Sequence, residues 1–445
     1  MIVYRKAFLG LHLLFRFYGS AIVRTALWGV LAATQTALLY ALVPDYVSQF
    51  FTEGRVMSYT VFTALLSLLV VFRQNAGYGR FHEGRVRLQT MSAAWADACI
   101  KALCFDGGCR SLGPPDEASR RFCSDCVHFF SLLHAVALQF LRSDWLLENL
   151  SEHDQAKLPP WDSGNSPNYK PSLVDYLVLR SVSTRRLPYN AAHPIPVIGR
   201  LSAAEEELLR VKGERTRTLD SCGWDAAKKG PGPLRTFLRY SFGPSQGKYV
   251  RGAAERTYQV FSWVHERFRH RMVEDGLDMP APILATVYAS LQKGLEAFEQ
   301  CRYLCDTPFP FSWSQLLMAM LLANQFMLPF VIVSSVQDWA LGIVFATVAT
   351  QAYWALNEVA REMEDPYCFE PNDIPLPRLQ YQFNERLLAA ANSQLPGGLV
   401  SGDAAFQHKV WRAIQRAASG SVGAPDAEMS LDAEVQVVVT KDAPE

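Results

Sequence analysis

Four uncharged, apolar stretches stand out along the chain, in two close pairs. The first pair runs from Thr25 to Pro44 and from Val56 to Phe72, and the second from Thr307 to Gln337 and from Trp339 to Asn357. A helix needs about 20 mainly apolar residues to cross the hydrocarbon core of a bilayer, with a range of about 17–25. Each stretch alone also fits a buried helix of a soluble protein, but four of them, joined in pairs by short polar turns, predict two transmembrane hairpins.

Charged residues flank the first pair of stretches unevenly. Arginine and lysine precede the first stretch and follow the second, whereas the turn between them carries Asp45, Glu53 and only Arg55. Positive residues collect on the cytoplasmic side of a membrane. We therefore expect both termini on that side of the plasma membrane, or on the equivalent side of an organellar membrane such as that of a chloroplast.

The polar middle of the chain predicts further helices. Apolar residues recur at helical spacing in residues 91–105, 124–150, 257–275 and 282–301. Within the second of these, Cys126 to Leu141 is short for a crossing and carries His128 and His134, which favours a buried helix over a fifth span. Residues 151–244 are rich in proline, glycine and charge and predict a loop-rich insertion, interrupted by a helix at 203–212.

These patterns predict an all-α membrane protein with four transmembrane helices and a helical cytosolic body. Residues 1–91 are expected to form an N-terminal helix and the first hairpin, 92–305 the cytosolic region with its insertion, 306–357 the second hairpin, 358–416 an acidic turn and cytosolic helices, and 417–445 a tail. The tail is rich in small and acidic residues, so we expect disorder there.

Composition and motifs narrow the functional classes. Lysine plus arginine and aspartate plus glutamate number 43 each, whereas nucleic-acid binders usually show a basic excess. Cys123 and Cys126 form one CxxC without a second ligand pair at zinc spacing, so we expect reduced thiols.

The sequence shows no phosphate-binding loop or nucleophile elbow. The absence of charge in the four stretches speaks against ion-coupled secondary transport, although a secondary anion transporter and a membrane scaffold remain the alternatives to a channel.

Three apolar residues of the second stretch fall on one face of a helix. Met57, Val61 and Leu65 are spaced at i, i+4 and i+8. Such a stripe either packs against other helices or lines a narrow passage that gates by dewetting.

Helix ends in the apolar stretches are candidate anion sites. Ser58 is a candidate cap of the second helix, and Ser312 marks the start of the third. Helix N-termini carry partial positive charge and free N–H groups that attract anions. The sequence therefore marks Ser58 and Ser312 as candidate helix starts that could attract an anion.

Arg73 follows the second stretch directly and has two interpretations. It could draw anions into an inner vestibule. The simpler interpretation, which we favour, is a membrane-surface anchor or a salt bridge with Glu83 or Glu358.

Two sequence blocks stand out beside the apolar stretches, SLLVVFRQNAGYGRFHEGR at residues 67–85 and LNEVAREMEDPY at residues 356–367. They resemble the bestrophin family, closest to its plant, algal and bacterial branch. The resemblance covers roughly residues 10–105 and 280–390. It implies a homopentamer around a central pore that passively conducts chloride or bicarbonate, with the second membrane helix lining the neck and no catalytic residues. By position, Met57, Val61 and Leu65 match the family's neck residues. The implied partners are small anions, membrane lipid and other copies of the chain.

An acidic run follows the last stretch, made of Glu362, Asp365, Glu370 and Asp373. In animal bestrophins the corresponding place holds calcium, which takes six to eight oxygen ligands. The resemblance thus implies a calcium site, although the plant and bacterial members need not use calcium. The alternative is a solvated acidic turn bounded by Pro366 and Pro371.

Overall fold

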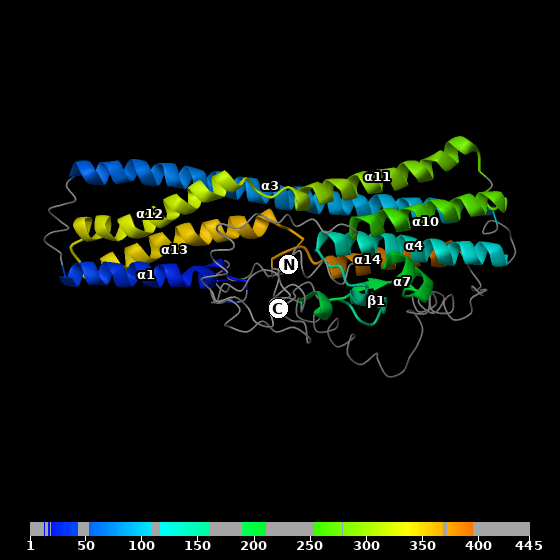
Figure 1. Cartoon of the computed structure of the whole chain (residues 1–445), viewed down its shortest axis with the longest axis horizontal. Helices are drawn as coiled ribbons and strands as arrows, with labels where there is room; N and C mark the ends of the chain where they lie inside the picture. Colours follow the sequence, from blue (N-terminus) through cyan, green and yellow to red (C-terminus); the bar gives the residue numbers. More distant parts are fainter. Residues whose placement is uncertain are drawn as a thin grey trace, which may run out of the picture.

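The structure, a computed structural model, describes residues 13, 17, 19–42, 53–107, 116–159, 189–210, 253–277, 279–367 and 372–394. Figure 1 shows an elongated arrangement of long helices that run roughly along one axis. One end contains four helices, and the other contains a thicker bundle, here called the body. The predicted tail at 417–445 and most of the insertion at 151–244 lie outside the described residues.

The four-helix end contains all four apolar stretches. It consists of α1 (Ala21–Leu42), the first part of α3 (Glu53–Phe105), α12 (Phe311–Ser335) and α13 (Trp339–Glu364). Asp338, the charge that divides the last two stretches, begins α13 by accepting hydrogen bonds from the N–H groups of Ala340 at 2.8 Å and Leu341 at 3.1 Å. A side-chain acceptor at this position satisfies N–H groups that the helix leaves free.

The helices of the first pair are separated in space. In the four-helix end α1 packs chiefly against α13 and α12, and α13 packs against α3. The rings of Trp28 on α1 and Trp354 on α13 stack with centroids 3.9 Å apart. The first pair therefore differs from a hairpin of adjacent helices, because the buried face of α1, made of small and polar residues, packs chiefly against the last helix of the group.

Helix α3 is a single unbroken helix of 53 residues that runs through both ends of the molecule. The sequence suggested separate helices at 56–72 and 91–105, but the charged residues between them do not interrupt it. Glycines in this region serve close packing: a Cβ at Gly77 would lie 2.8 Å from the carbonyl oxygen of Ala360 on α13. The predicted domain boundary after residue 91 falls inside this helix and stays a prediction.

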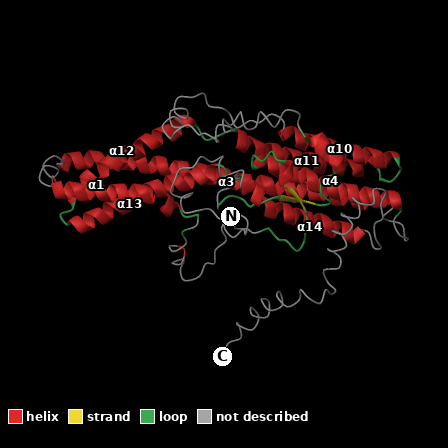
Figure 2. Cartoon of the chain, turned by 60° about the horizontal axis from the view of Figure 1, so that its bottom comes forward, coloured by secondary structure: helices red, strands yellow, loops and turns green. Residues whose placement is uncertain are grey.

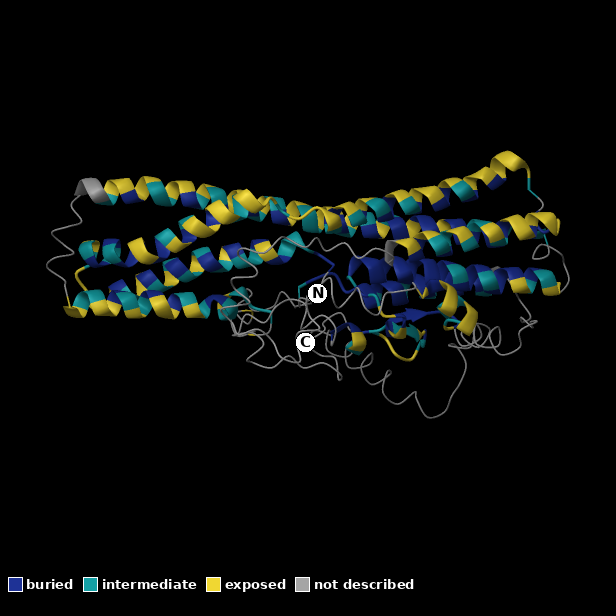
Figure 3. Ribbon diagram, viewed as in Figure 1, coloured by how far each residue is buried: buried dark blue, intermediate teal, exposed yellow. Residues whose placement is uncertain are grey.

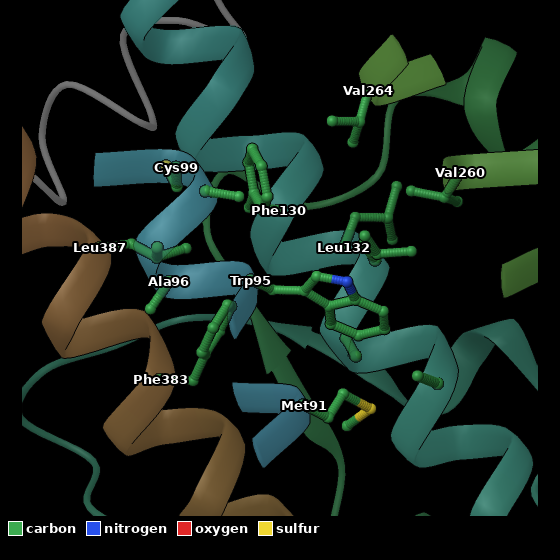
Figure 4. Close-up of a cluster of buried hydrophobic side chains, with 14 of the residues drawn as sticks. Met91, Trp95, Ala96, Cys99, Phe130, Leu132, Val260, Val264, Phe383 and Leu387 are labelled. Atoms are coloured by element: carbon green, nitrogen blue, oxygen red, sulfur yellow. The ribbon is translucent and has the colours of Figure 1, made fainter. Parts of the chain in front are cut away.

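The body surrounds the second part of α3. Its other long helices are α4 (Glu117–Leu141), α10 (Ala253–Val273), α11 (Ala281–Asp306) and α14 (Leu376–Gln394). Figure 3 shows α4 almost wholly buried, whereas the helices of the four-helix end are exposed along much of their length. The large side chains of Trp95, Phe130 and Phe383 meet in the core of the body, as Figure 4 shows.

In the part of the chain that the structure describes, two very short strands accompany the helices. β1 (Leu150–Glu152) pairs in parallel with β2 (Ile195–Val197), which lies against α14 (Figure 2). The predicted helix near residue 203 is confirmed as α7 (Ala203–Leu209), which begins with a capping box between Ser202 and Glu205. Strands of three residues carry too little alternation to be seen in a sequence.

Candidate permeation site

Met57, Val61 and Leu65 form an exposed stripe on α3. These residues are 66%, 57% and 55% exposed, respectively. The opposite face of the same helix is buried: Leu66 and Val70 pack with residues of α12 and α13. Within the described residues, the stripe is therefore not used to pack the chain against itself. It is left to face lipid, another copy of the chain or a pore.

A polar contact lies behind the stripe. The hydroxyl of Tyr59 donates to Oδ1 of Asn324 on α12 at 2.8 Å, and both residues are buried. Gln325, next along α12, accepts from the indole N–H of Trp354 at 3.2 Å and donates to the carbonyl of Trp28 at 3.5 Å. Sequence reasoning missed these residues, although polar side chains inside an apolar stretch are themselves a signal of function.

The two candidate serines lie at opposite ends of the four-helix end. Tyr59 bonds to Asn324, whereas Phe72, further along α3, packs on Trp313 with ring centroids 4.8 Å apart. Helices α3 and α12 are thus antiparallel, so Ser58 is far from Ser312. Ser312 lies in the first turn of α12, which begins at Phe311 as the sequence suggested. Ser58 lies five residues beyond the start of α3 at Glu53, so its interpretation as a cap is wrong.

Arg73 is buried, at 5% exposure, and its charge is compensated inside the chain. Its Nε donates to Glu364 at 2.7 Å and its Nη1 to Asn357 at 2.7 Å. The expected salt bridge therefore forms, but with Glu364 rather than with Glu83 or Glu358. The guanidinium also lies 5.4 Å from the ring centroid of Phe309, just before α12.

The two sequence blocks at 67–85 and 356–367 meet where the four-helix end joins the body. Arg80 donates to the carbonyl of Glu364 at 3.0 Å and to that of Leu304 at 2.7 Å, which ties α3 to α13 and α11. The hydroxyl of Tyr367 donates to the carbonyl of Gly84 at 2.9 Å. These residues thus build the junction through which the two ends of the molecule are coupled.

The acidic run begins in the last turn of α13 and is only partly described, since Glu370 lies outside the described residues. Asp365 follows the last residue of α13, and Asp373 is buried. Glu362 is buried too and pairs with Arg24 of α1, which also lies 3.4 Å from Glu358. Among the described residues, no group of three or more histidine, cysteine, aspartate or glutamate side chains is arranged to hold a metal ion.

A second contact fixes Glu362. Nδ2 of Asn372 donates to Oε2 of Glu362 at 3.1 Å and to the carbonyl of Gly19 at 3.1 Å. The acidic turn is thereby fastened to the start of α1 by a protein cation and an amide. Protein groups therefore hold the Glu362 carboxylate, and the four-residue calcium set stays a prediction.

Comparison of the sequence with models of known protein families identifies the family of the chain. A family model described as "Bacterial/Fungal Bestrophin protein" matches residues 1–162 and 234–389, which is well over half of the chain. The chain belongs to the bestrophin family. The match skips residues 163–233, which fall inside the stretch interpreted from sequence as an insertion.

Solved structures of similar fold agree with this kinship. A point variant of a bacterial bestrophin homologue from Klebsiella pneumoniae gives a TM-score of 0.53 at 14% identity, over 84% of this chain and 99% of that one. A variant of a membrane protein gives 0.51 at 15% identity, over 84% and 99%. At such identities the likeness shows the bestrophin fold alone.

A curated relative adds a shorter match. A voltage-dependent anion channel-forming protein of Nostoc sp. is 30% identical over 93 residues, which are 21% of this chain and 30% of that protein. The chain thus spans less than a third of the length of this relative. Five described helices, α1, α3, α4, α12 and α13, are long and apolar enough to cross a membrane. Together with the family, they make the chain an integral membrane protein.

Proposed function

We propose that this bestrophin forms a passive anion channel that conducts chloride or bicarbonate. The observation that carries the proposal is the uncharged stripe of Met57, Val61 and Leu65, which the rest of the described chain leaves uncovered. The family and the name of the Nostoc relative support anions as the permeant class.

In this proposal the channel is a homopentamer in which five copies of the stripe face one axis. The helices that cross the membrane are α1, the first part of α3, α12 and α13, with both termini on the cytoplasmic side. Helix α4 is also apolar enough to cross a membrane, but it lies in the core of the body, since 89% of the residues in its apolar segment are buried. The membrane is that of the cell surface or of an organelle.

An apolar neck suits rapid conduction. It offers no fixed charge that would hold an ion, and it stops water and ions when it becomes too narrow to stay wet. Anion preference then comes from partial charges elsewhere, such as the start of α12 at Ser312. Arg73 contributes mainly through its ion pair with Glu364, because its guanidinium is buried.

The test is recording from the purified protein in planar bilayers under a chloride gradient. The expected result is steady current that reverses near the chloride potential, and Val61→Ala is expected to raise the permeability of larger anions relative to chloride. The matched control is Val30→Ala on α1, since Val30 and Val61 are both 57% exposed.

Cation-selective current, or saturable coupled flux without single-channel steps, would replace the channel with another function such as secondary transport. If Val61→Ala and Val30→Ala behave alike, the neck lies elsewhere even though the chain is a channel.

A further inference from the structure

The neck helix carries a buried hydroxyl between two residues of the exposed stripe. Tyr59 stands between Met57 and Val61 in sequence and points to the opposite side of α3, where it is 8% exposed. It packs with Leu328 and Val331 of α12. A hydroxyl in such an apolar place is costly unless it is hydrogen-bonded.

Its partner is an amide that is buried even more deeply. Oδ1 of Asn324, a residue that is 1% exposed, accepts the Tyr59 hydroxyl at 2.8 Å. Polar side chains within membrane helices are rare and usually have a functional reason. This bond links the neck helix to α12 at the level of the stripe.

The next residue extends the link to the other two helices. Gln325, 2% exposed, accepts from the indole N–H of Trp354 on α13 at 3.2 Å and donates to the carbonyl of Trp28 on α1 at 3.5 Å. Asn324 and Gln325 thus connect α12 with all three neighbouring helices of the four-helix end. We call these two residues the polar node.

The polar node lies where α12 is weakened as a helix. Pro329 follows Gln325 by four residues and has no N–H, so it cannot donate to the Gln325 carbonyl as a helix normally requires. One residue further, the carbonyl of Phe326 accepts from Nε2 of Gln35 on α1 at 3.1 Å. Side chains around this turn therefore define the path of α12 where its own backbone bonding is incomplete.

We infer that the polar node positions the neck helix, through Tyr59, and so determines which anions the neck admits by size. This inference rests on the proposed channel function. Loss of the Tyr59–Asn324 bond releases α3 from α12 beside Met57 and Val61 and changes how close the five stripes can approach. Asn324 and Tyr59 are positioning residues, since neither faces the stripe itself.

The experiment compares Tyr59→Phe with Ser67→Ala in planar bilayers, using the ratio of thiocyanate to chloride permeability. Ser67 is the matched control because its hydroxyl lies on the same helix and bonds to the hydroxyl of Tyr353 on α13 at 2.9 Å, but it lies beyond the stripe. Tyr59→Phe is expected to shift the ratio at least about twofold, because the released neck helix changes the distance between the five stripes, and Ser67→Ala to leave it unchanged.

Further variants separate positioning from general stability. Asn324→Leu is expected to shift the ratio in the same direction as Tyr59→Phe, and the double variant to add little to either. If Tyr59→Phe yields no channels, Asn324→Gln is measured in the same way and must shift the ratio, because the longer side chain keeps an amide on α12 but moves the acceptor oxygen away from the Tyr59 hydroxyl.

Two failures are distinguishable. Channels of Tyr59→Phe with the unaltered permeability ratio, even if fewer of them open, would overturn the positioning role and leave the channel function standing. Wild-type protein without anion current would instead remove the proposed function on which the inference rests.

Discussion

The two ends of the molecule use similarly apolar helices in opposite ways. In α1, α3 and α13, 22% of the residues in the apolar 18-residue segment are buried within the chain. In the corresponding segment of α4 the share is 89%. The body buries its apolar residues in its own core, as soluble proteins do. The four-helix end turns them outward, which is stable only against lipid, another subunit or a narrow pore.

Polar groups differ between the two ends as well. In the body, buried polar side chains form a chain in which Ser92 bonds to His134 at 2.7 Å and His134 bonds to Gln380 at 2.6 Å. In the four-helix end, they include the polar node, Arg73 and Asn357 near the junction with the body, and threonines on α1 and α13. Polar burial therefore marks the interior of one end and the helix contacts of the other.

The largest expected effect tests whether the two ends differ in self-packing. Phe130→Ala removes a fully buried ring from the core of the body and should lower the free energy of unfolding by about 3–5 kcal/mol. Val344→Ala on α13, where the residue is 55% exposed, should cost far less. Denaturant unfolding of the detergent-solubilised protein measures both, and equal losses would contradict the contrast.

The next effect concerns the link between α1 and the acidic turn. Arg24→Gln leaves Glu362 buried without its cation and should cost about 3 kcal/mol. Without Arg24 the buried carboxylate of Glu362 lacks a compensating cation, so added calcium should raise the melting temperature of this variant and not that of the wild type.

A surface pair supplies the control for Arg24. Arg361 also bonds to Glu358, at 2.6 Å, but its side chain is 47% exposed, and Arg361→Gln should change stability little. Calcium that stabilises the wild type as strongly as Arg24→Gln would restore the acidic turn as a calcium site.

The smallest effect is a dependence of the body on pH. Burial lowers the pKa of His134 from 6.5 to about 4, against the opposing hydrogen bond with Gln380. Below pH 6.5 the unfolded chain takes up a proton that the folded chain does not, so stability falls as pH decreases from about 6.5 towards 4. The loss attributable to this histidine should reach about 2–3 kcal/mol near pH 4.5.

The measurement is the difference in pH dependence between the wild type and His134→Gln. The variant should lose less stability between pH 7 and pH 4.5, measured by thermal unfolding in detergent. Parallel curves for the two proteins would show that His134 titrates normally in the folded state.

The apolar stretches were predictable because a run without charge is a local property of the sequence. The same holds for α4, whose two histidines and short apolar run identified it as a core helix. The continuity of α3 was not predictable, since the charged residues 73–90 suggest a break and only the packing against α13 and α11 removes it.

The partners of the candidate site residues depend on contacts distant in sequence. Arg73 and Glu364 are 291 positions apart, and spacing along the chain offers no means to choose Glu364 over Glu358. The stripe itself follows from helical periodicity, but Tyr59 and Asn324 behind it become visible only when α3 and α12 are placed side by side.

The unbroken course of α3 gives the molecule a mechanical link. At 1.5 Å per residue, its 53 residues extend roughly 80 Å, far beyond the ~30 Å of hydrocarbon in a bilayer. A helix without a break transmits rotation about its axis from one end to the other. A shift of α3 in the body, where it packs against α4, α11 and α14, would therefore involve the same continuous helix that carries Met57, Val61 and Leu65.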